Sequence, residues 1–93
     1  MIKTFRSANA ERLFRRERVK LFEGFEKQVL RKLVILHAAQ KIDDLASVPG
    51  DRLEKLKGSR EHQHSIRIND QWRVCFVWKE GNAFDVEIVD YND

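Results

Sequence analysis

The strongest constraint on how this chain folds is a two-residue alternation of apolar side chains near its carboxyl end. Three expected strands, at 65–68, 72–79 and 84–89, carry apolar residues at every even position: Ile66, Ile68, Trp72, Val74, Phe76, Trp78, Phe84, Val86 and Ile88. Successive side chains of a strand point to opposite faces of a sheet, so these residues share one face. The connections are too short for parallel pairing. The sequence therefore predicts an antiparallel meander whose even face is core and whose odd face is partly open to solvent.

The amino-terminal part follows a helical period instead. Phe22, Phe25, Val29, Leu33 and Leu36 recur at steps of three and four, which predicts one long helix within 22–40 that packs on the sheet. The remaining expected elements are a first strand at 2–5, a short helix capped by Ser7, a further helical turn at 42–46 and a strand at 53–57. Together they predict an α+β fold: a short amino-terminal strand and two or three helices on one face of a twisted, mainly antiparallel sheet.

Length and composition limit the class of protein. With 93 residues, the chain can bury one hydrophobic core, so we expect a single domain over 1–93. No apolar run approaches the roughly 20 residues that cross a bilayer, which predicts no membrane association. The start of the chain lacks the apolar stretch of a secretory signal, and the single Cys75 cannot form an internal disulfide. These features favour the cytoplasm.

Charge is distributed unevenly along the chain. The net charge is +3, but residues 1–41 carry +7 and residues 42–93 carry −4. The densest basic run consists of Arg15, Arg16, Arg18 and Lys20. Such a run is typical of a surface that binds a polyanion, and it is equally typical of a surface that is simply solvated.

Two arginines interrupt the strand pattern. A three-residue turn at 69–71 pairs Arg67 with Arg73 directly across the hairpin, and a similar turn at Gly81 pairs 79 with 83 and 73 with 89. Like charges opposite each other destabilise a sheet by up to about 1 kcal/mol. Either nearby acids (Glu87, Asp85 or Asp90) neutralise the pair, or the two guanidiniums bind an anion with the geometry of a phosphate.

The chain also resembles a known family. The segments IKTFR, KIDDL, PGDRLEKLKG, HSIRINDQWRVCF and EIVDY together resemble the HigB branch of the RelE-like toxins of bacterial toxin-antitoxin pairs, over essentially the whole chain. The resemblance implies a metal-independent endoribonuclease that cuts mRNA on the translating ribosome and inhibits translation. It also implies a HigA-like antitoxin with a helix-turn-helix domain, through which DNA would be contacted only indirectly.

The resemblance also implies catalytic residues. The family's lysine in LKG falls on Lys57, the arginine after the tryptophan on Arg73, and the terminal acidic-tyrosine pair on Asp90 and Tyr91. The chain departs from the family at two positions, because Asn92 follows Tyr91 where close members commonly have histidine, and Glu54 stands where some members have one.

RNA cleavage without a metal needs a base, an acid and cations for the developing phosphorane charge. Arg73 is expected to stabilise charge, with Arg67 or Arg60 as a second clamp. Lys57 is expected to act as a base or a further charge stabiliser, while Glu54 is an alternative base or a surface partner of a lysine. Tyr91 is expected to stack on a base, donate a proton or pack in the protein.

The remaining polar residues fit RNA contacts better than metal binding. RNA contacts are expected from Arg60, Arg67, His62, His64 and Asn92. The spacing of His62 and His64 is weak as a zinc motif, so neither a metal nor another cofactor is expected. An alternative hypothesis is that the chain is a toxin-like module with weak or no catalytic activity that retains antitoxin or RNA binding.

Overall fold

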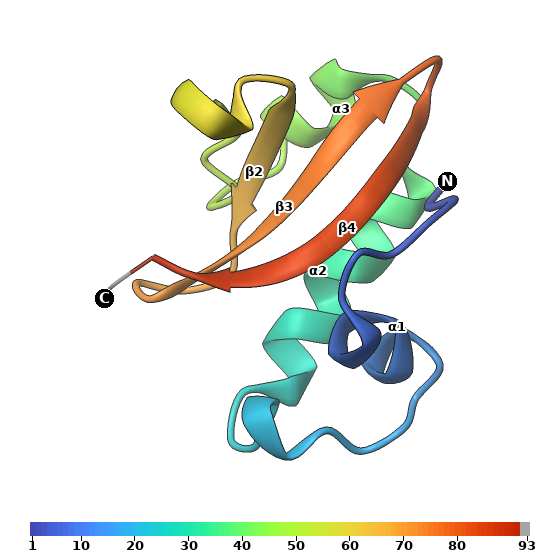
Figure 1. The fold of residues 1–93 in the computed structure, drawn as a ribbon, viewed down its shortest axis with the longest axis vertical. Coiled ribbons are helices and arrows are strands. Elements are labelled where there is room, and N and C mark those ends of the chain that lie inside the picture. The colour runs from blue at the N-terminus through green and yellow to red at the C-terminus, as the bar shows by residue number, and fades with distance from the viewer. Residues whose placement is uncertain (92–93) are drawn as a thin grey trace.

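The computed structural model describes residues 1–91 and contains helices packed on a four-stranded sheet (Figure 1). The helices are α1 (Ala8–Phe14), α2 (Glu26–Ala38) and α3 (Ile42–Ala46), with 3-10 turns η1 (Lys20–Phe22) and η2 (Gly58–Arg60). The strands are β1 (Glu54–Lys55), β2 (Gln63–Arg67), β3 (Trp72–Lys79) and β4 (Asn82–Asp90). The strand order is β1-β2-β3-β4, and all three pairings are antiparallel. The predicted fold class is confirmed.

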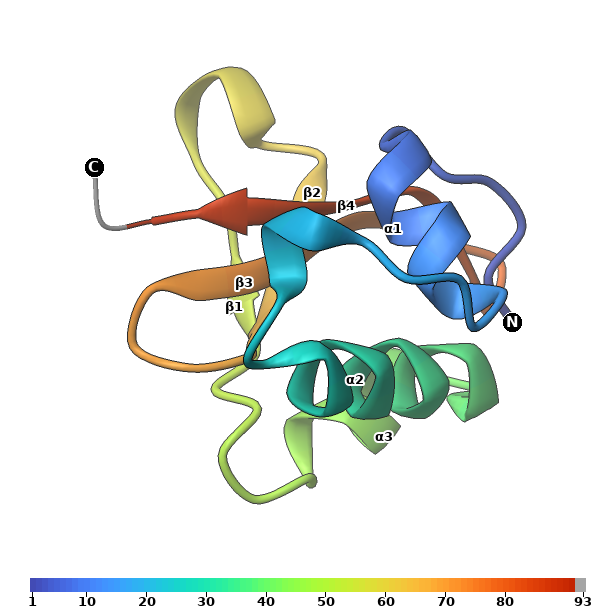
Figure 2. The ribbon, with the colours of Figure 1, turned by 90° about the horizontal axis from the view of Figure 1, so that it is seen from below.

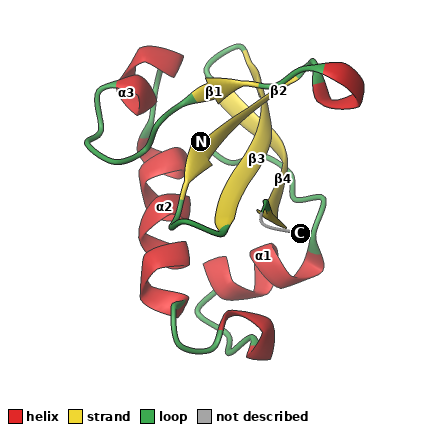
Figure 3. Ribbon diagram, turned by 90° about the vertical axis from the view of Figure 1, so that its left-hand side faces the viewer, coloured by secondary structure: helices red, strands yellow, loops and turns green. Residues whose placement is uncertain are grey.

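The helical stripe and the even-numbered strand residues form the core. Val29, Leu33 and Leu36 of α2 are fully buried, as are Val74 and Phe76 of β3. The long helix begins only at Glu26, because Gly24 takes a φ of 94° that ends the preceding turn of chain. In two views, α2 and η2 lie on opposite sides of the sheet (Figures 2 and 3). No helix within 1–91 is both long and apolar enough to cross a bilayer.

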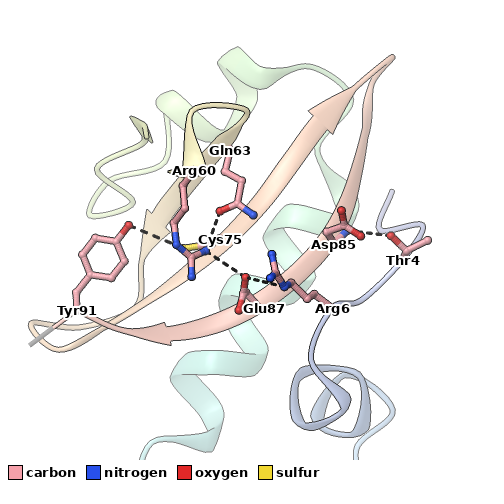
Figure 4. A network of polar contacts seen from close by, with 8 residues as sticks. All are labelled: Thr4, Arg6, Arg60, Gln63, Cys75, Asp85, Glu87 and Tyr91. Carbon is pink, nitrogen blue, oxygen red and sulfur yellow. Dashed lines mark hydrogen bonds and ion pairs between the residues drawn. The ribbon is translucent and has the colours of Figure 1, made fainter. Parts of the chain in front are cut away.

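The amino-terminal segment differs from its prediction as a strand. It runs beside β4 through two isolated parallel bridges, Ile2 with Ala83 and Phe5 with Val86. Between the bridges, the Thr4 hydroxyl oxygen accepts a hydrogen bond from the Asp85 amide at 2.8 Å (Figure 4). The pairing is limited to these bridges, and Asp85, which lies between the two paired positions of β4, has a φ of 53°.

The first hairpin has the predicted register. Arg67 lies opposite Arg73, and the Asn69 side chain closes the turn by accepting hydrogen bonds from the amides of Gln71 and Trp72, both at 2.9 Å. Asparagine often stabilises a turn in this way, through its own side-chain oxygen.

The second hairpin has the predicted register in only one half. Arg73 pairs with Val89 as expected, but Lys79 pairs with Asn82 rather than with position 83. The turn is shorter than predicted, because Glu80 and Gly81 both adopt positive φ, as two-residue hairpin turns require. A register shift between Cys75 and Val77 restores the pairing.

This shift changes which residues of β4 face the core. Ala83 and Val86 are fully buried, whereas Phe84 pairs with Val77 and is not part of the core cluster. The prediction that Phe84 faces the core is therefore wrong. Asp85, with φ of 53°, is the extra residue that reverses the alternation.

Candidate active site

The odd-numbered side of β2 and β3, here called the polar face, is only partly open to solvent, as predicted. Lys79 is exposed and Val77 is half-buried. Four residues of this face are buried, namely Gln63, Ser65, Arg73 and Cys75. The segment that contains η2 lies on this side and its residue Arg60 bonds to the face, which removes water from the polar groups beneath it.

Arg73 is held firmly by its neighbours. Its Nε donates to Ser65 Oγ at 2.7 Å, and its Nη2 donates to the carbonyl oxygens of Arg52 at 2.5 Å and Ser65 at 3.3 Å. The remaining nitrogen, Nη1, lies 3.7 Å from Glu54 Oε1, which is an ion pair without a hydrogen bond. Nη1 is thus the part of the guanidinium that can still donate to an anion.

Arg67 does not share an anion site with Arg73, although their backbones are paired. Its guanidinium forms an ion pair with Asp70 in the turn. The hypothesis of two guanidiniums that wait together for one phosphate is therefore wrong, because each has its own partners. The alternative, neutralisation by Glu87, Asp85 or Asp90, also names the wrong acids, since the carboxylates that pair with the two arginines are Asp70 and Glu54.

Tyr91 completes the surroundings of Arg73. The guanidinium carbon of Arg73 lies 5.8 Å from the centre of the Tyr91 ring, within the range of a cation–π contact. The Tyr91 hydroxyl points inward and lies 4.0 Å from the sulfur of Cys75 (Figure 4). Burial, followed by the neighbouring Cys75, raises the pKa of Tyr91, so the phenol stays protonated at neutral pH. The ring remains partly exposed.

Arg60 is tied to the polar face by a second set of contacts. Its Nη1 donates to Gln63 Oε1 at 2.8 Å and to Glu87 Oε2 at 3.1 Å, and Glu87 also pairs with Arg6 at 3.8 Å (Figure 4). Burial works to lower the pKa of Arg60, but the hydrogen bond and charge of Glu87 outweigh it and raise the pKa. Arg60 is therefore a fixed cation beside Cys75 and Tyr91.

Lys57 and His62 come together in a surface pocket next to this face. The pocket has a volume of about 590 Å³ and is lined by Lys55, Leu56, Lys57, Gly58, Glu61 and His62. Lys57 is exposed, and the side chain of His62 is 85% exposed, with Nε2 at 3.7 Å from Glu61. The pocket thus presents exposed lysine and histidine side chains that could contact a polyanion.

Asp90, another candidate, lies away from Arg73. Asp90 pairs with Trp72 across the sheet and accepts a hydrogen bond from the Gln71 side chain at 2.9 Å, so it braces the first hairpin turn. Asn92 lies outside the described residues.

His64 lies on the opposite face of the sheet from Arg73. Its ring stacks on Phe76 with centroids 6.2 Å apart, and its buried Nδ1 has no hydrogen-bond partner within 1–91. Burial, with a smaller contribution from Lys55, lowers the pKa of His64 below 6.5, so the ring is neutral at pH 7. The structure therefore does not place His64 with the expected RNA contacts.

This lowered pKa predicts how stability changes in mild acid. An unfolded chain binds a proton at His64 near pH 6.5, and the folded chain does so only at lower pH, so this contribution to stability is complete above pH 6.5 and is lost below it. We expect the urea midpoint of the wild type to fall more than that of His64→Gln between pH 7.5 and pH 5. His62→Gln, at the exposed histidine, is the matched control and should follow the wild type. An equal fall in all three proteins would contradict the assignment.

Sequence reasoning missed the residues that hold the arginines in place. Ser65 and Gln63 orient Arg73 and Arg60, and Glu87 carries the charge opposite Arg60. These three residues could have been found from the sequence, because all of them stand at odd-numbered positions. Odd-numbered side chains of these strands lie on the same face as Arg73. Within residues 1–91, no group of three or more His, Cys, Asp or Glu side chains is arranged to hold a metal ion.

Comparison with known proteins supports the family resemblance. A family model described as the RelE-like toxin of type II toxin-antitoxin system HigB matches residues 3–92. Toxin HigB-1 of Vibrio cholerae is 45% identical over 62 residues, which cover 67% of this chain and 65% of that protein. A protein of Haemophilus influenzae is 35% identical over 63 residues, covering 68% of this chain and 60% of that protein. The matches span a little less than two thirds of the length of either relative.

A solved structure shares the fold at low sequence identity. The crystal structure of a YafQ mutant from E. coli superposes with a TM-score of 0.59 and 9% identity, covering 98% of this chain and 94% of the other. At this identity the likeness concerns the fold alone.

Proposed function

This chain belongs to the HigB-like family of RelE-like toxins of type II toxin-antitoxin systems, and on that basis we propose that it is an mRNA endoribonuclease acting on the ribosome to inhibit translation. The observation that carries the proposal is the arrangement around Arg73. Its Nη1 lies 3.7 Å from the Glu54 carboxylate, and its guanidinium carbon lies 5.8 Å from the Tyr91 ring. A base, an anion stabiliser and a stacking surface are thus adjacent.

The proposed reaction uses the 2′-hydroxyl of the RNA as the nucleophile. Glu54, whose side chain is 56% exposed, accepts the proton of this hydroxyl as its oxygen attacks the adjacent phosphorus. Arg73 Nη1 donates to a non-bridging oxygen and stabilises the charge of the phosphorane. The bond from phosphorus to the 5′-oxygen then breaks, which leaves a 2′,3′-cyclic phosphate on one fragment and, on the other, a 5′-oxygen that takes its proton from water. This chemistry requires no metal ion from the protein.

Tyr91 is better placed for stacking than for proton donation. Its hydroxyl faces the buried Cys75, whereas its ring is 42% exposed. An exposed aromatic ring beside an arginine is a surface on which an unpaired RNA base stacks. Lys57 and His62, in the neighbouring pocket, would contact the phosphates on either side, with Arg60 as a fixed cation.

The set of catalytic groups supports the proposed dependence on the ribosome. The arrangement around Arg73 provides a candidate base and a cation, while the hydroxyl of Tyr91, a candidate acid, faces Cys75. An mRNA already oriented in the decoding site gains several kcal/mol from positioning alone. We therefore expect little cleavage of free RNA.

The proposed partners follow from family membership. We expect a HigA-like antitoxin with a helix-turn-helix domain to neutralise the toxin in the cytoplasm, with DNA contacted only through that complex. We also propose that residues 1–93 act as one toxin domain.

Induced expression without an antitoxin tests the proposal directly. We expect growth arrest, together with new 5′ ends inside translated mRNAs when the RNA ends are sequenced. Purified protein should cut mRNA in a translation reaction and leave the same RNA intact when ribosomes are omitted. Arrest without new RNA ends would contradict the nuclease assignment.

The extensive bonding of Arg73 supports a second candidate. Three of its hydrogen bonds go to protein acceptors, which suits a structural arginine in a toxin-like module that binds without cutting. Such a module would bind antitoxin or RNA and produce neither growth arrest nor new RNA ends.

A further inference from the structure

A buried ion pair lies outside the groups discussed so far. Lys32 of α2 and Asp51 meet at 2.5 Å between Nζ and Oδ1, with side-chain exposures of 8% and 0%. Taking both charges out of water is costly, and such a pair is often no more stabilising than apolar residues of similar volume. Stability alone therefore gives a weak reason for this pair.

Its bonding is also incomplete. Asp51 Oδ2 is buried and has no hydrogen-bond partner within 1–91. A buried carboxylate that served only to stabilise the fold would be expected to have both oxygens satisfied. The pair is better explained by a role in fixing the backbone at Asp51 and Arg52.

Asp51 begins the segment that supports both arginines of the first hairpin. The Asp51 carbonyl accepts a hydrogen bond from the Arg67 amide at 2.6 Å, and the next carbonyl, of Arg52, accepts from Arg73 Nη2 at 2.5 Å. Lys32 thus connects the long helix to the backbone that receives the Arg73 guanidinium.

The backbone of this segment needs such a restraint. Arg52 has a φ of 45°, in the left-handed region that is unfavourable for a residue other than glycine. Strained residues of this kind persist only where their surroundings hold them. The neighbouring Asp51, fixed by Lys32, provides that hold.

We propose that Lys32 and Asp51 are positioning residues, which hold the Arg52 carbonyl in place and so direct Nη1 of Arg73 toward the edge shared with Glu54. This inference deepens the proposed function and rests on it. If the pair is lost, Arg52 relaxes, its carbonyl turns away, and the guanidinium loses one of the bonds that fix its orientation.

The test replaces both charges with neutral groups of similar size, in Lys32→Met/Asp51→Asn. The matched control, Arg12→Met/Glu17→Gln, removes an exposed ion pair with an N–O distance of 3.4 Å. The first readout is the NMR signal of the Arg73 Nε–H group, which the bond to Ser65 Oγ protects from exchange with solvent. We expect faster exchange of this proton in the test variant and no change in the control.

The second readout is cleavage of mRNA in a translation reaction. We expect kcat to fall on the order of 100-fold, as a displacement of about 1 Å in an active site can cause, with KM nearly unchanged. Adding Arg52→Gly to the test variant should recover part of the loss, because glycine adopts positive φ without strain. A purely structural pair would show no such rescue.

The outcomes separate this inference from the proposed function. A folded test variant with wild-type Nε–H exchange and wild-type kcat would overturn the positioning role. If the test variant does not fold, Lys32→Gln removes the charge of the lysine and keeps a hydrogen-bond donor for Asp51, and unchanged exchange and kcat in that folded variant would overturn the role equally. If the wild type cuts no mRNA, the proposed function fails, while the NMR comparison still decides whether the pair orients Arg73.

Discussion

Arg73→Ala should abolish growth arrest and lower the rate of mRNA cleavage by about 10²- to 10³-fold, the usual loss when one stabiliser of transition-state charge is removed. Nη1 of Arg73 is the guanidinium nitrogen left able to donate to a phosphate beside Glu54, so the lost interaction is one made in the transition state. Growth after induction and kcat in a translation reaction measure the effect.

Because Arg73 is buried, its removal can also destabilise the fold, so the activity assay needs controls for folding. Its removal takes the donor from the buried Ser65 Oγ, and a buried group left unpaired costs about 1–3 kcal/mol. Thermal unfolding must therefore accompany the assay, and Arg73→Lys provides a variant that keeps the charge. Lys79→Ala removes an exposed cation from the other end of β3 and should leave cleavage unchanged.

The variant Arg67→Ala tests whether Arg73 binds the phosphate alone or shares the anion site with Arg67. Because Arg67 pairs with Asp70, we expect a much smaller loss than for Arg73→Ala. Equal losses in the two variants would restore the paired-guanidinium hypothesis, and a fully toxic, folded Arg73→Ala protein would remove Arg73 from the mechanism.

Glu54→Gln should lower kcat by about 10²- to 10⁴-fold, the usual contribution of a general base. Glutamine keeps the size of the side chain but cannot accept the proton of the 2′-hydroxyl. The exposed position of Glu54 predicts little change in stability, so the thermal midpoint should stay close to that of the wild type.

Lys57→Met is the companion variant, because Lys57 is the other candidate base. In the structure it lines the neighbouring pocket, so its loss should raise KM through weaker phosphate binding and change kcat little. The opposite pattern, with kcat lost in Lys57→Met and kept in Glu54→Gln, would assign the base to Lys57.

The long helix and the hairpin that carries the candidate site can be predicted from the sequence alone. The alternation at 65–79 gave the register that pairs Arg67 with Arg73, because one face of those strands had to be core. The helical stripe of α2 was equally readable from its spacing. Both patterns are local, and each is enforced by burial of one continuous face.

The contacts of each charged group, in contrast, depend on how distant segments of the chain meet. The parity of Arg73 placed it correctly on the face opposite the core, but its partners Ser65, Arg52 and Glu54 depend on how β1 and the preceding loop return to the hairpin. The bulge at Asp85 likewise follows from a two-residue turn and the docked amino-terminal segment. Burial of one face of a helix or strand produces a periodic pattern of apolar residues that can be read from the sequence. An ion pair such as Lys32 with Asp51 joins residues that are distant in the sequence, and no local pattern predicts that they meet.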